Sequence, residues 1–575
     1  MKTISKIITA AFAVALMFSI SSCEGFLKEK SYDFVQPDDV EDSDNGAKQL
    51  FIGVYSQIAS MFNSNTFPMT WIYDEDYLTG PSWAFGYLGA GNYLNDGYIP
   101  NYWNGLYTLI HRANYTIFRL NGMENVTPEL KDNYIGQMSF LKAWSYYMLV
   151  RAFGPIPLRE KSISETGDRN VERSPVMTVY GHILDLLDDA MELCPLNTET
   201  GFEKGMISAG AAAGLKVKVL CTIGSASLPA GTKIWVQGGI PFIKNGTDKA
   251  YTDPQKITHD KELVAGFEGV DSKEYYKQAY QLAEKIMNGE WGTYQLVDYD
   301  NLWGKDNAYG PEQLWSYRGT TADTRYCEYF SYHISGILAS SSDTRIYDGM
   351  WYGGRDHWYK LMEPKDYRAL KGVRHRWKRV WDDTIAQYYP NNIEYNTLVE
   401  NKVAPYDDGE YYVCPQFDLY YLAYPTKYVD RGSMTDTHGD AFWPLLRYAD
   451  IVLLYAEAYA ECNGTADGKA LTALNSVRQR SNASDYSLDG IVGIGDIVEF
   501  RSTVLRERSL ELFCEGDRRW DLVRWGIFVQ TMNAIGGNDE VGVNKMRYER
   551  HKLFPLPKSE MDSNGAIKEN NKGWD

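Results

Sequence analysis

The chain has few of the residues that build disulfide frameworks, zinc sites or nucleic-acid-binding surfaces. Only 7 of its 575 residues are cysteines. No two of them form a Cys-x-x-Cys pair, which argues against a zinc ribbon and a disulfide-framed fold. Lysine and arginine number 58 against 76 aspartate and glutamate, giving a formal net charge of −18. Because nucleic-acid binding needs a broad basic surface, we do not expect a polynucleotide partner.

Catalytic and metal-binding signatures are also missing from the sequence. The 8 histidines form no His-Glu-x-x-His motif and no pair at ligand spacing, and neither a Gly-x-Ser-x-Gly elbow nor a phosphate-binding loop occurs. Asp298 and Asp300 begin like a calcium loop, but Leu302 and Trp303 occupy the places of a ligand and of the required glycine. Paired carboxylates occur, as expected in an acidic chain, and sequence cannot show the separation that a glycosidase needs. We therefore predict no enzyme, no metal site and no cofactor.

No segment after residue 22 has the length and uncharged character of a membrane span. Residues 7–20 form a shorter apolar run behind two lysines, as in an export signal. The Ile-Ser-Ser sequence at 20–22, followed by Cys23, matches the cleavage pattern of bacterial lipoproteins. We expect residues 1–22 to be a signal peptide and Cys23 to be lipidated, since two acyl chains hold a soluble domain to a membrane. An ordinary secretory signal with an accidental cysteine is the alternative.

The stretch behind Cys23 is polar. Residues 24–45 contain 8 acidic side chains and few large apolar ones. Such a composition is typical of a solvated tether, so we expect residues 23–45 to form a lipidated, flexible leash that leads into the folded body.

Helical periodicity recurs along the rest of the chain. The clearest case starts at Pro128, places Ile135, Met138 and Leu141 on one side, and stops at Gly154. Helices are predicted at residues 128–153, 175–193, 206–223, 273–289, 443–462, 465–482 and 498–516. Because helices of similar length alternate with short breaks, we predict a mainly α fold of stacked helix pairs.

Long stretches between these helices do not look helical, at residues 63–100, 226–272 and 292–442. Loops of this length inside a compact domain are usually functional. The whole chain holds 44 tyrosines and 16 tryptophans against 21 phenylalanines. Most of its aromatic rings therefore carry a polar group that can stay wet while the ring face packs.

Aromatic side chains gather at residues 67–98, beside Asp74 and Asp76, and again at residues 309–359. A sugar ring has one weakly polar C–H face and a rim of hydroxyls, so an aromatic platform edged by Asp, Asn and Arg suits it. The residues nominated for ligand binding are Trp71, Tyr73, Trp83, Tyr87, Trp315, Tyr326 and Trp351. The alternative for any one ring is a place in the core of an irregular loop layer.

Charged residues near the C-terminus are placed among apolar ones in amphipathic helices. Glu507, Glu511 and Glu515 are four residues apart, so they align on one helical face. Arg508, Arg518 or an arginine from another helix could meet them, and arginine forks suit such internal bidentate pairs. We interpret this pattern as a structural clamp.

Four ordered motifs along the chain carry a family resemblance. They are FLKAWSYYMLVRAFGPIPL at 140–158, LLRYADIVLLYAEA at 445–458 with ALNSVRQR at 473–480, EGDRRWDLVRWG at 515–526, and LFPLP at 553–557 with NNKGW at 570–574. Over nearly its full length the chain resembles the SusD/RagB family of outer-membrane nutrient-binding lipoproteins of the Bacteroidetes. One departure is KVKVLC at 216–221, where the family more often has an alanine- and arginine-rich helix.

The resemblance implies a fold of tetratricopeptide-like helix pairs with long irregular loops and few short strands. It divides the mature chain into a SusD-like N-terminal helical region at 46–225 and a C-terminal region at 226–575 that includes the loop-rich ligand-binding part. It also implies a lipid-anchored position in the cell outer membrane, facing outward, as the lid of a SusC-like TonB-dependent transporter. The family's ligand site is not fixed by motif, so the seven nominated residues rest on loop position and chemistry alone.

The function expected from these features is capture of an oligosaccharide at the cell surface and its delivery to the transporter, without catalysis. Three alternatives stay open: a peptide-capturing member of the same family, a glycoside hydrolase, and a helical-repeat adaptor that binds no small ligand.

Overall fold

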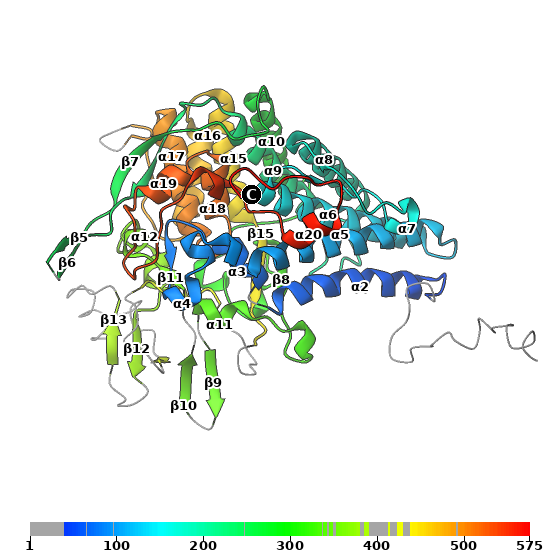
Figure 1. The fold of residues 1–575 in the computed structure, drawn as a ribbon, viewed down its shortest axis with the longest axis horizontal. Helices are drawn as coiled ribbons and strands as arrows, with labels where there is room; N and C mark the ends of the chain where they lie inside the picture. The colour runs from blue at the N-terminus through cyan, green and yellow to red at the C-terminus, as the bar shows by residue number, and fades with distance from the viewer. Residues whose placement is uncertain are drawn as a thin grey trace, which may run out of the picture.

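The structure is a computed structural model, and its mainly helical body has smaller strand-containing parts at one side (Figure 1). It describes residues 40–64, 66–95, 97–246, 248–335, 337–341, 344–348, 352–379, 385–389, 412–414, 422–428, 438–489 and 493–574. The predicted signal peptide, Cys23 and most of the predicted tether precede these residues, and Trp351 also lies outside them. Among the described helices, none has the length and apolar character needed to cross a membrane.

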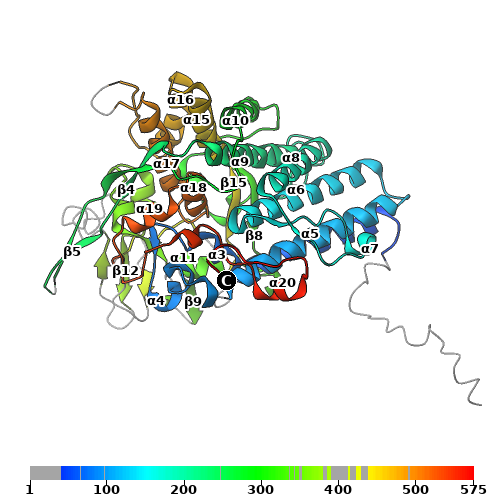
Figure 2. The ribbon, with the colours of Figure 1, turned by 45° about the horizontal axis from the view of Figure 1, so that its top comes forward.

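Long helices make up the body of the molecule (Figures 1 and 2). They are α2 (Asp44–Phe62), α5 (Tyr98–Gly122), α6 (Pro128–Phe153), α8 (Val176–Leu193), α9 (Ala209–Ser227), α10 (Ser272–Met287), α15 (Tyr448–Asn463), α16 (Gly468–Arg480) and α17 (Ile497–Glu511). From α5 to α10 each long helix packs on the next one in the chain, α10 packs on α15, and α15 also contacts α16 and α17. The predicted fold class, helix pairs with few short strands, is confirmed.

Shorter helices sit in the connections between the long ones. They are α3 (Thr66–Ile72), α4 (Ser82–Phe85), α7 (Ile163–Thr166), α11 (Phe330–Ser335), α12 (Asp356–Tyr359), α13 (Tyr367–Leu370), α18 (Arg518–Arg524), α19 (Phe528–Asn533) and α20 (Lys558–Ser563). The stretch at 63–100, predicted to be non-helical, therefore contains α3 and α4.

Small residues explain how α9 comes to lie in the middle of the body. Its N-cap Ser208 accepts a hydrogen bond from the backbone N–H of Ala211, and nearly every residue of the helix is buried. A Cβ at Gly210 would lie 2.2 Å from the carbonyl oxygen of Trp291, and one at Gly224 would lie 2.9 Å from the ring of Tyr276. These glycines let α10 and the segment after it approach α9 closely.

The strands form two-stranded ribbons and one larger sheet. They are β1 (Leu78–Thr79), β2 (Ile156–Pro157), β3 (Arg173–Ser174), β4 (Lys233–Gly238), β5 (Phe242–Asn245), β6 (Asp248–Tyr251), β7 (Gln255–Asp260), β8 (Gln313–Arg318), β9 (Ile337–Ser341), β10 (Thr344–Asp348), β11 (Gly353–Gly354), β12 (Arg376–Arg379), β13 (Ile385–Tyr388), β14 (Tyr412–Cys414) and β15 (Phe442–Arg447). The five-stranded sheet has the order β13-β12-β14-β10-β9, and the ribbons are β1-β11, β2-β3, β4-β7, β5-β6 and β8-β15.

One predicted helix start is wrong. Residues 443–447 belong to β15, which pairs antiparallel with β8, and α15 begins only at Tyr448. Pro444 lacks the N–H that a helix or a regular ladder needs, and the β8–β15 register shifts directly after it. All of β15 is buried, so long-range pairing overrides the helical periodicity of its sequence.

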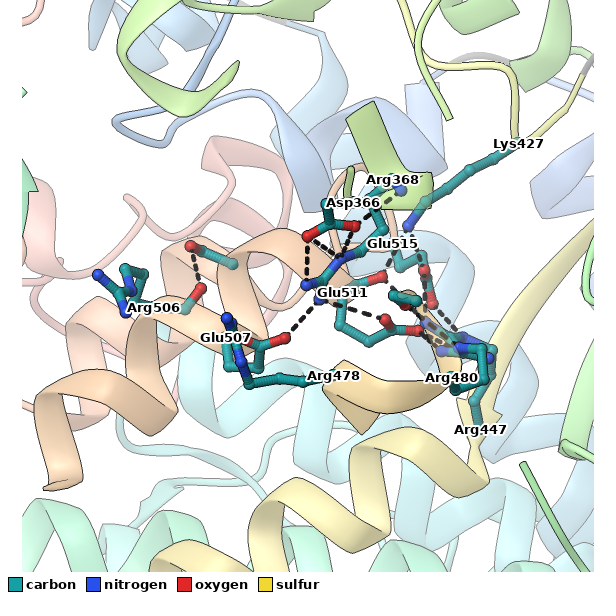
Figure 3. Close-up of polar contacts among 12 residues, drawn as sticks. Asp366, Arg368, Lys427, Arg447, Arg478, Arg480, Arg506, Glu507, Glu511 and Glu515 are labelled. Carbon is teal, nitrogen blue, oxygen red and sulfur yellow. Dashed lines mark hydrogen bonds and ion pairs between the residues drawn. The ribbon is translucent and has the colours of Figure 1, made fainter. Parts of the chain in front are cut away.

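The predicted clamp lies around the acids of α17 and the turn that follows it (Figure 3). Glu507, Glu511 and Glu515 are at most 4% exposed. Arg368 Nη1 contacts Glu507 at 2.6 Å, and Arg478 Nη1 contacts its second carboxylate oxygen at 2.7 Å. The three acids are therefore paired inside the molecule with cations from other elements.

Arg447 is the centre of the second half of this clamp. It contacts Glu511 at 3.0 Å, Glu515 at 2.7 Å and Glu312 at 2.7 Å, and Arg480 also contacts Glu511. Burial alone would raise the pKa of Glu511, but Arg480 and Arg447 outweigh burial and hold that pKa well below its ordinary value. The prediction of a structural clamp is confirmed.

The acids of the clamp pair with cations from other segments of the chain. Neither Arg508 nor Arg518, the two nearby arginines that the sequence offered, is among these partners. Arg508 instead contacts Asp450 at 2.5 Å and Asp521 at 2.8 Å, and Arg518 pairs with Asp76 at 2.7 Å.

The end of the predicted tether is part of the folded body. Asp42 accepts hydrogen bonds from the backbone N–H groups of Glu124 and Asn125, and Asp44 accepts one from Thr127. These acids fix the start of α2 to the turn between α5 and α6, so the tether ends before them.

Candidate functional site

Two aromatic loops that lie far apart in the sequence meet where β1 pairs with β11. Leu78 pairs with Gly354 and Thr79 with Gly353. A Cβ at Gly354 would lie 2.5 Å from the Trp358 ring, so only a glycine permits this close approach. The pairing places α4, which follows β1, near α11, as both views show (Figures 1 and 2).

A continuous series of ring contacts joins the two loops. Tyr352 lies 4.6 Å from Tyr73 and 5.8 Å from Phe85, measured between ring centroids. His333 of α11 lies 5.7 Å from Tyr352 and 5.0 Å from Tyr329. Aromatic pairs at such distances stabilise each other beyond the area they bury. These buried and half-buried rings form a rigid base under α4.

Trp83 and Tyr87 lie two residues before and two residues after Phe85 of this base, and their side chains reach water. Each is 56% exposed. Gly86 and Tyr87 continue the right-handed helical backbone of α4, so the two residues are four apart on one helical path. Side chains with this spacing share a face of the helix. We call Trp83 and Tyr87 the aromatic surface.

Three nominated rings serve the core instead. Trp71 lies in α3, is 3% exposed and stacks on Trp443 at 5.9 Å. Tyr73 is 1% exposed and belongs to the base described above. Trp315 lies in β8 and is 5% exposed. Because a buried ring presents no open face to a sugar, these three nominations are corrected to core positions.

The remaining two nominated residues, Tyr326 and Trp351, belong neither to the core positions above nor to the aromatic surface. Tyr326 is half-buried at the end of a 3₁₀ turn, with the Arg325 guanidinium 5.5 Å from its ring centroid. Trp351 lies outside the described residues. The nearest opening to Trp315 is a cavity of about 520 Å³ that it shares with Tyr309, which is 40% exposed.

Buried ion pairs fix the segment between α3 and β1, which precedes the helix that carries the aromatic surface. Asp74 contacts Arg547 at 2.7 Å and Arg519 at 2.5 Å, and Asp76 contacts Arg518 at 2.7 Å. The expectation that the acids at 74–76 would edge the platform is therefore wrong, since they are at most 5% exposed. They bind this segment to α18 and the C-terminal part of the chain.

Glu75 lies between these pairs and has no salt bridge within the described part of the chain. Burial, together with the negative charge of Asp76, raises its pKa to about 8. The group is therefore protonated at neutral pH.

Metal ligands and disulfides are absent from the part of the chain that the structure describes. No group of three His, Cys, Asp or Glu side chains is placed to hold a metal ion there. Five cysteines are free and buried: Cys194, Cys221, Cys327, Cys462 and Cys514. Cys221, Cys462 and Cys514 therefore act as small buried side chains.

The fold and the site together define a helix-pair protein whose loops present aromatic side chains to solvent on an internally ion-paired frame. Residues 304–574 match the model of the SusD family, and residues 25–219 match a second model described as starch-binding associating with outer membrane. The chain belongs to the SusD/RagB family, and it is an outer-membrane-associated member of it.

Characterised relatives and solved structures agree with this assignment. SusD-like protein P2 of Formosa agariphila is 22% identical over 84% of this chain and 81% of its own length. A SusD homolog from Bacteroides thetaiotaomicron has a similar crystal structure, with a TM-score of 0.72 and 22% identity over 94% of this chain and 98% of that one. A laminarin-binding SusD-like protein superposes with a TM-score of 0.64 and 17% identity, over 92% of this chain and 99% of that one.

Proposed function

We propose that this protein captures an oligosaccharide at the cell surface and passes it to a SusC-like TonB-dependent transporter, without catalysing any reaction. The observation that carries the proposal is the pair of rings of the aromatic surface, each 56% exposed on a rigid base. Single exposed apolar side chains are normal at a protein surface, whereas neighbouring ones on a shared helical face mark interaction sites, so we take this pair as the ligand site.

The spacing of the two rings suits a carbohydrate. Side chains four apart on a helix have Cβ atoms roughly 5–6 Å from each other, which is about the size of one sugar residue. Each ring covers the C–H face of a sugar while the hydroxyl of Tyr87 donates or accepts a hydrogen bond at the rim. The matched family model, described as starch-binding, and the laminarin-binding neighbour support this class of ligand.

The affinity expected from two stacked rings is modest. A shallow site of this kind corresponds to dissociation constants of about a millimolar to a micromolar, or roughly 4 to 8 kcal/mol. Weak binding is sufficient for a protein that holds its ligand above a transporter and then releases it. In this arrangement the lipid on Cys23 anchors the protein, and the helical side of the body contacts the transporter.

The proposal is tested by a binding screen of the chain from residue 24 onward against neutral and charged glycans and against mixed oligopeptides. Affinity gel electrophoresis reports retention, and chromatography of the supernatant reports new products. We expect retention by at least one glycan and no products. Binding of peptides alone would instead make the protein a peptide-capturing member of the family, and released sugars would make it a hydrolase.

A further inference from the structure

A cavity of about 630 Å³ lies apart from the aromatic surface, and residues of the C-terminal segment at 549–573 form part of its lining. Its walls come from the end of α6, the start of α8, the end of α9, the 263–267 loop and α18. Most of the wall is apolar, with Val150, Val176, Ala226, Leu263, Phe267 and Trp520 among its residues. This size and composition are typical of sites for small organic ligands, which range over roughly 300–1,000 Å³.

One buried cation in this wall lacks an acidic partner. Arg151 lines the cavity and is 7% exposed, and it forms no salt bridge with any carboxylate of the described residues. Its Nε has no hydrogen-bond partner among the described residues. Its Nη2 donates to the sulfur of Met148 at 2.5 Å, which is a weak acceptor.

Aromatic rings surround the Arg151 guanidinium. It lies 4.7 Å from the ring centroid of Trp520, 4.8 Å from Tyr147 and 5.7 Å from Trp71. Such contacts stabilise a desolvated cation, but by less than an uncompensated buried charge costs. The rings therefore hold the guanidinium in position but do not neutralise its charge.

The neighbouring buried arginines differ from Arg151, because each of them is paired with an acid. Arg524 also lines the cavity, but it contacts Asp521 at 2.9 Å and the carboxylate of Glu457. Arg519 contacts Asp74 at 2.5 Å. Arg519 and Arg524 therefore each have a carboxylate partner. Arg151 faces the cavity without one among the described residues.

The mouth of the cavity is basic although the chain as a whole is acidic. Arg550, Lys552 and Lys572 line it, together with Glu549 as the one acid. Lys552 pairs with Glu549 at 2.6 Å and also with Glu262, so Arg550 and Lys572 remain to attract an anion. A positive opening in a protein of formal charge −18 steers small anions to this place.

We propose that this cavity binds an amphipathic carboxylate, a small molecule with an apolar body and one acidic group. The carboxylate forms a bidentate pair with the Arg151 guanidinium, and the apolar body fills the space between Val176, Phe267 and Trp520. Neutral oligosaccharides do not suit this site, because its wall offers few hydrogen-bond partners for their hydroxyls. The site is therefore separate from the aromatic surface and does not depend on the glycan proposal.

The test compares decanoate with decanol, which have the same apolar chain and differ in charge. The mature chain is titrated with each compound by calorimetry, below the concentration at which decanoate forms micelles, and the quenching of tryptophan fluorescence reports the approach to Trp520. We expect saturable binding of decanoate with a dissociation constant below a millimolar, and binding of decanol at least ten-fold weaker. No saturation by decanoate, or equal affinity for both compounds, would overturn the proposal.

A rim variant keeps the test independent of folding. Leu263 is 53% exposed at the mouth, so Leu263→Glu adds a negative charge without disturbing the core. It should weaken decanoate binding several-fold and leave decanol unchanged. Arg112→Gln is the matched control, since Arg112 is exposed on α5 and does not line the cavity. If Leu263→Glu and Arg112→Gln bind decanoate like the parent, the carboxylate does not enter this cavity.

Arg151→Gln then tests the role of the guanidinium itself. We expect this variant to lose the preference for decanoate over decanol, with a circular dichroism spectrum like that of the parent. A folded Arg151→Gln protein that keeps a ten-fold preference for decanoate would contradict the assignment of Arg151.

Discussion

Replacing Trp83 by alanine removes the larger ring of the aromatic surface without opening the core. A tryptophan side chain can bury about 250 Å², so its exposure of 56% leaves roughly 140 Å² for a ligand to cover. A sugar that stacks on one face covers about half of that area, or about 70 Å², and at about 25 cal/mol per Å² this gives roughly 1.8 kcal/mol. Trp83→Ala should therefore raise the dissociation constant about 20-fold.

The assay is calorimetric titration with the best glycan from the screen, repeated for Tyr87→Ala and for two reference variants. Tyr87→Ala should weaken binding less, because its ring is smaller. Phe118→Ala removes a 41% exposed ring from α5 and should bind like the parent. Trp71→Ala empties a core position, so it should lower the melting temperature and leave the affinity of the folded fraction unchanged.

The pattern among these variants decides whether the reasoning is right. If Trp83→Ala and Tyr87→Ala both bind with the affinity of the parent, the exposed rings do not hold the glycan. If Phe118→Ala loses as much affinity as Trp83→Ala, the loss reflects general surface apolarity and the location of the site is refuted.

Three further predictions concern the frame. Glu75→Gln should raise the denaturant midpoint at pH 8 but not at pH 4.5. The raised pKa of Glu75, about 8, means that the parent loses stability progressively as pH rises from the ordinary value of 4.5. The gain of the variant at pH 8 should be about 4 kcal/mol, and equal midpoints of variant and parent at both pH values would contradict this prediction. Glu511→Gln should lower the free energy of unfolding by about 3–5 kcal/mol at pH 7. Because the pKa of Glu511 is lowered in the folded state, its stabilisation is lost as pH falls below 4.5. The difference in stability between variant and parent, measured by urea titration, should therefore close in acid. Gly210→Ala should destabilise the protein by about 1–3 kcal/mol, because its Cβ would meet a backbone carbonyl at 2.2 Å. Gly181→Ala in α8 is the control, since the space around its Cβ is open. It should stabilise the protein by roughly 0.5–1 kcal/mol in thermal melts.

Helices with clear end signals were predictable from the sequence. α6 runs from Pro128 to the residue before Gly154, as its start and stop residues indicate. α5 was missed, although its buried residues Ile99, Trp103, Leu106 and Ile110 recur every three or four positions. Its many asparagines and glycines weaken the local preference, and packing against α6 supplies the missing stability.

The site was predictable only in part. Sequence located the aromatic loops, and among the rings of the first loop it included the two that are exposed. It could not separate Trp83 from Trp71, because both lie in short helices with similar composition, and only Trp71 is covered by Trp443 from a segment more than 350 residues away. Trp315 was misjudged for the same reason, since its burial depends on the pairing of β8 with β15.

The most direct test of the account is hydroxyl-radical footprinting of the mature chain with and without a saturating oligosaccharide. The account predicts that the ligand protects Trp83 and Tyr87 from oxidation and leaves Phe118, which is 41% exposed, unchanged. Saturation of the protein with a glycan that protects neither Trp83 nor Tyr87 would contradict it.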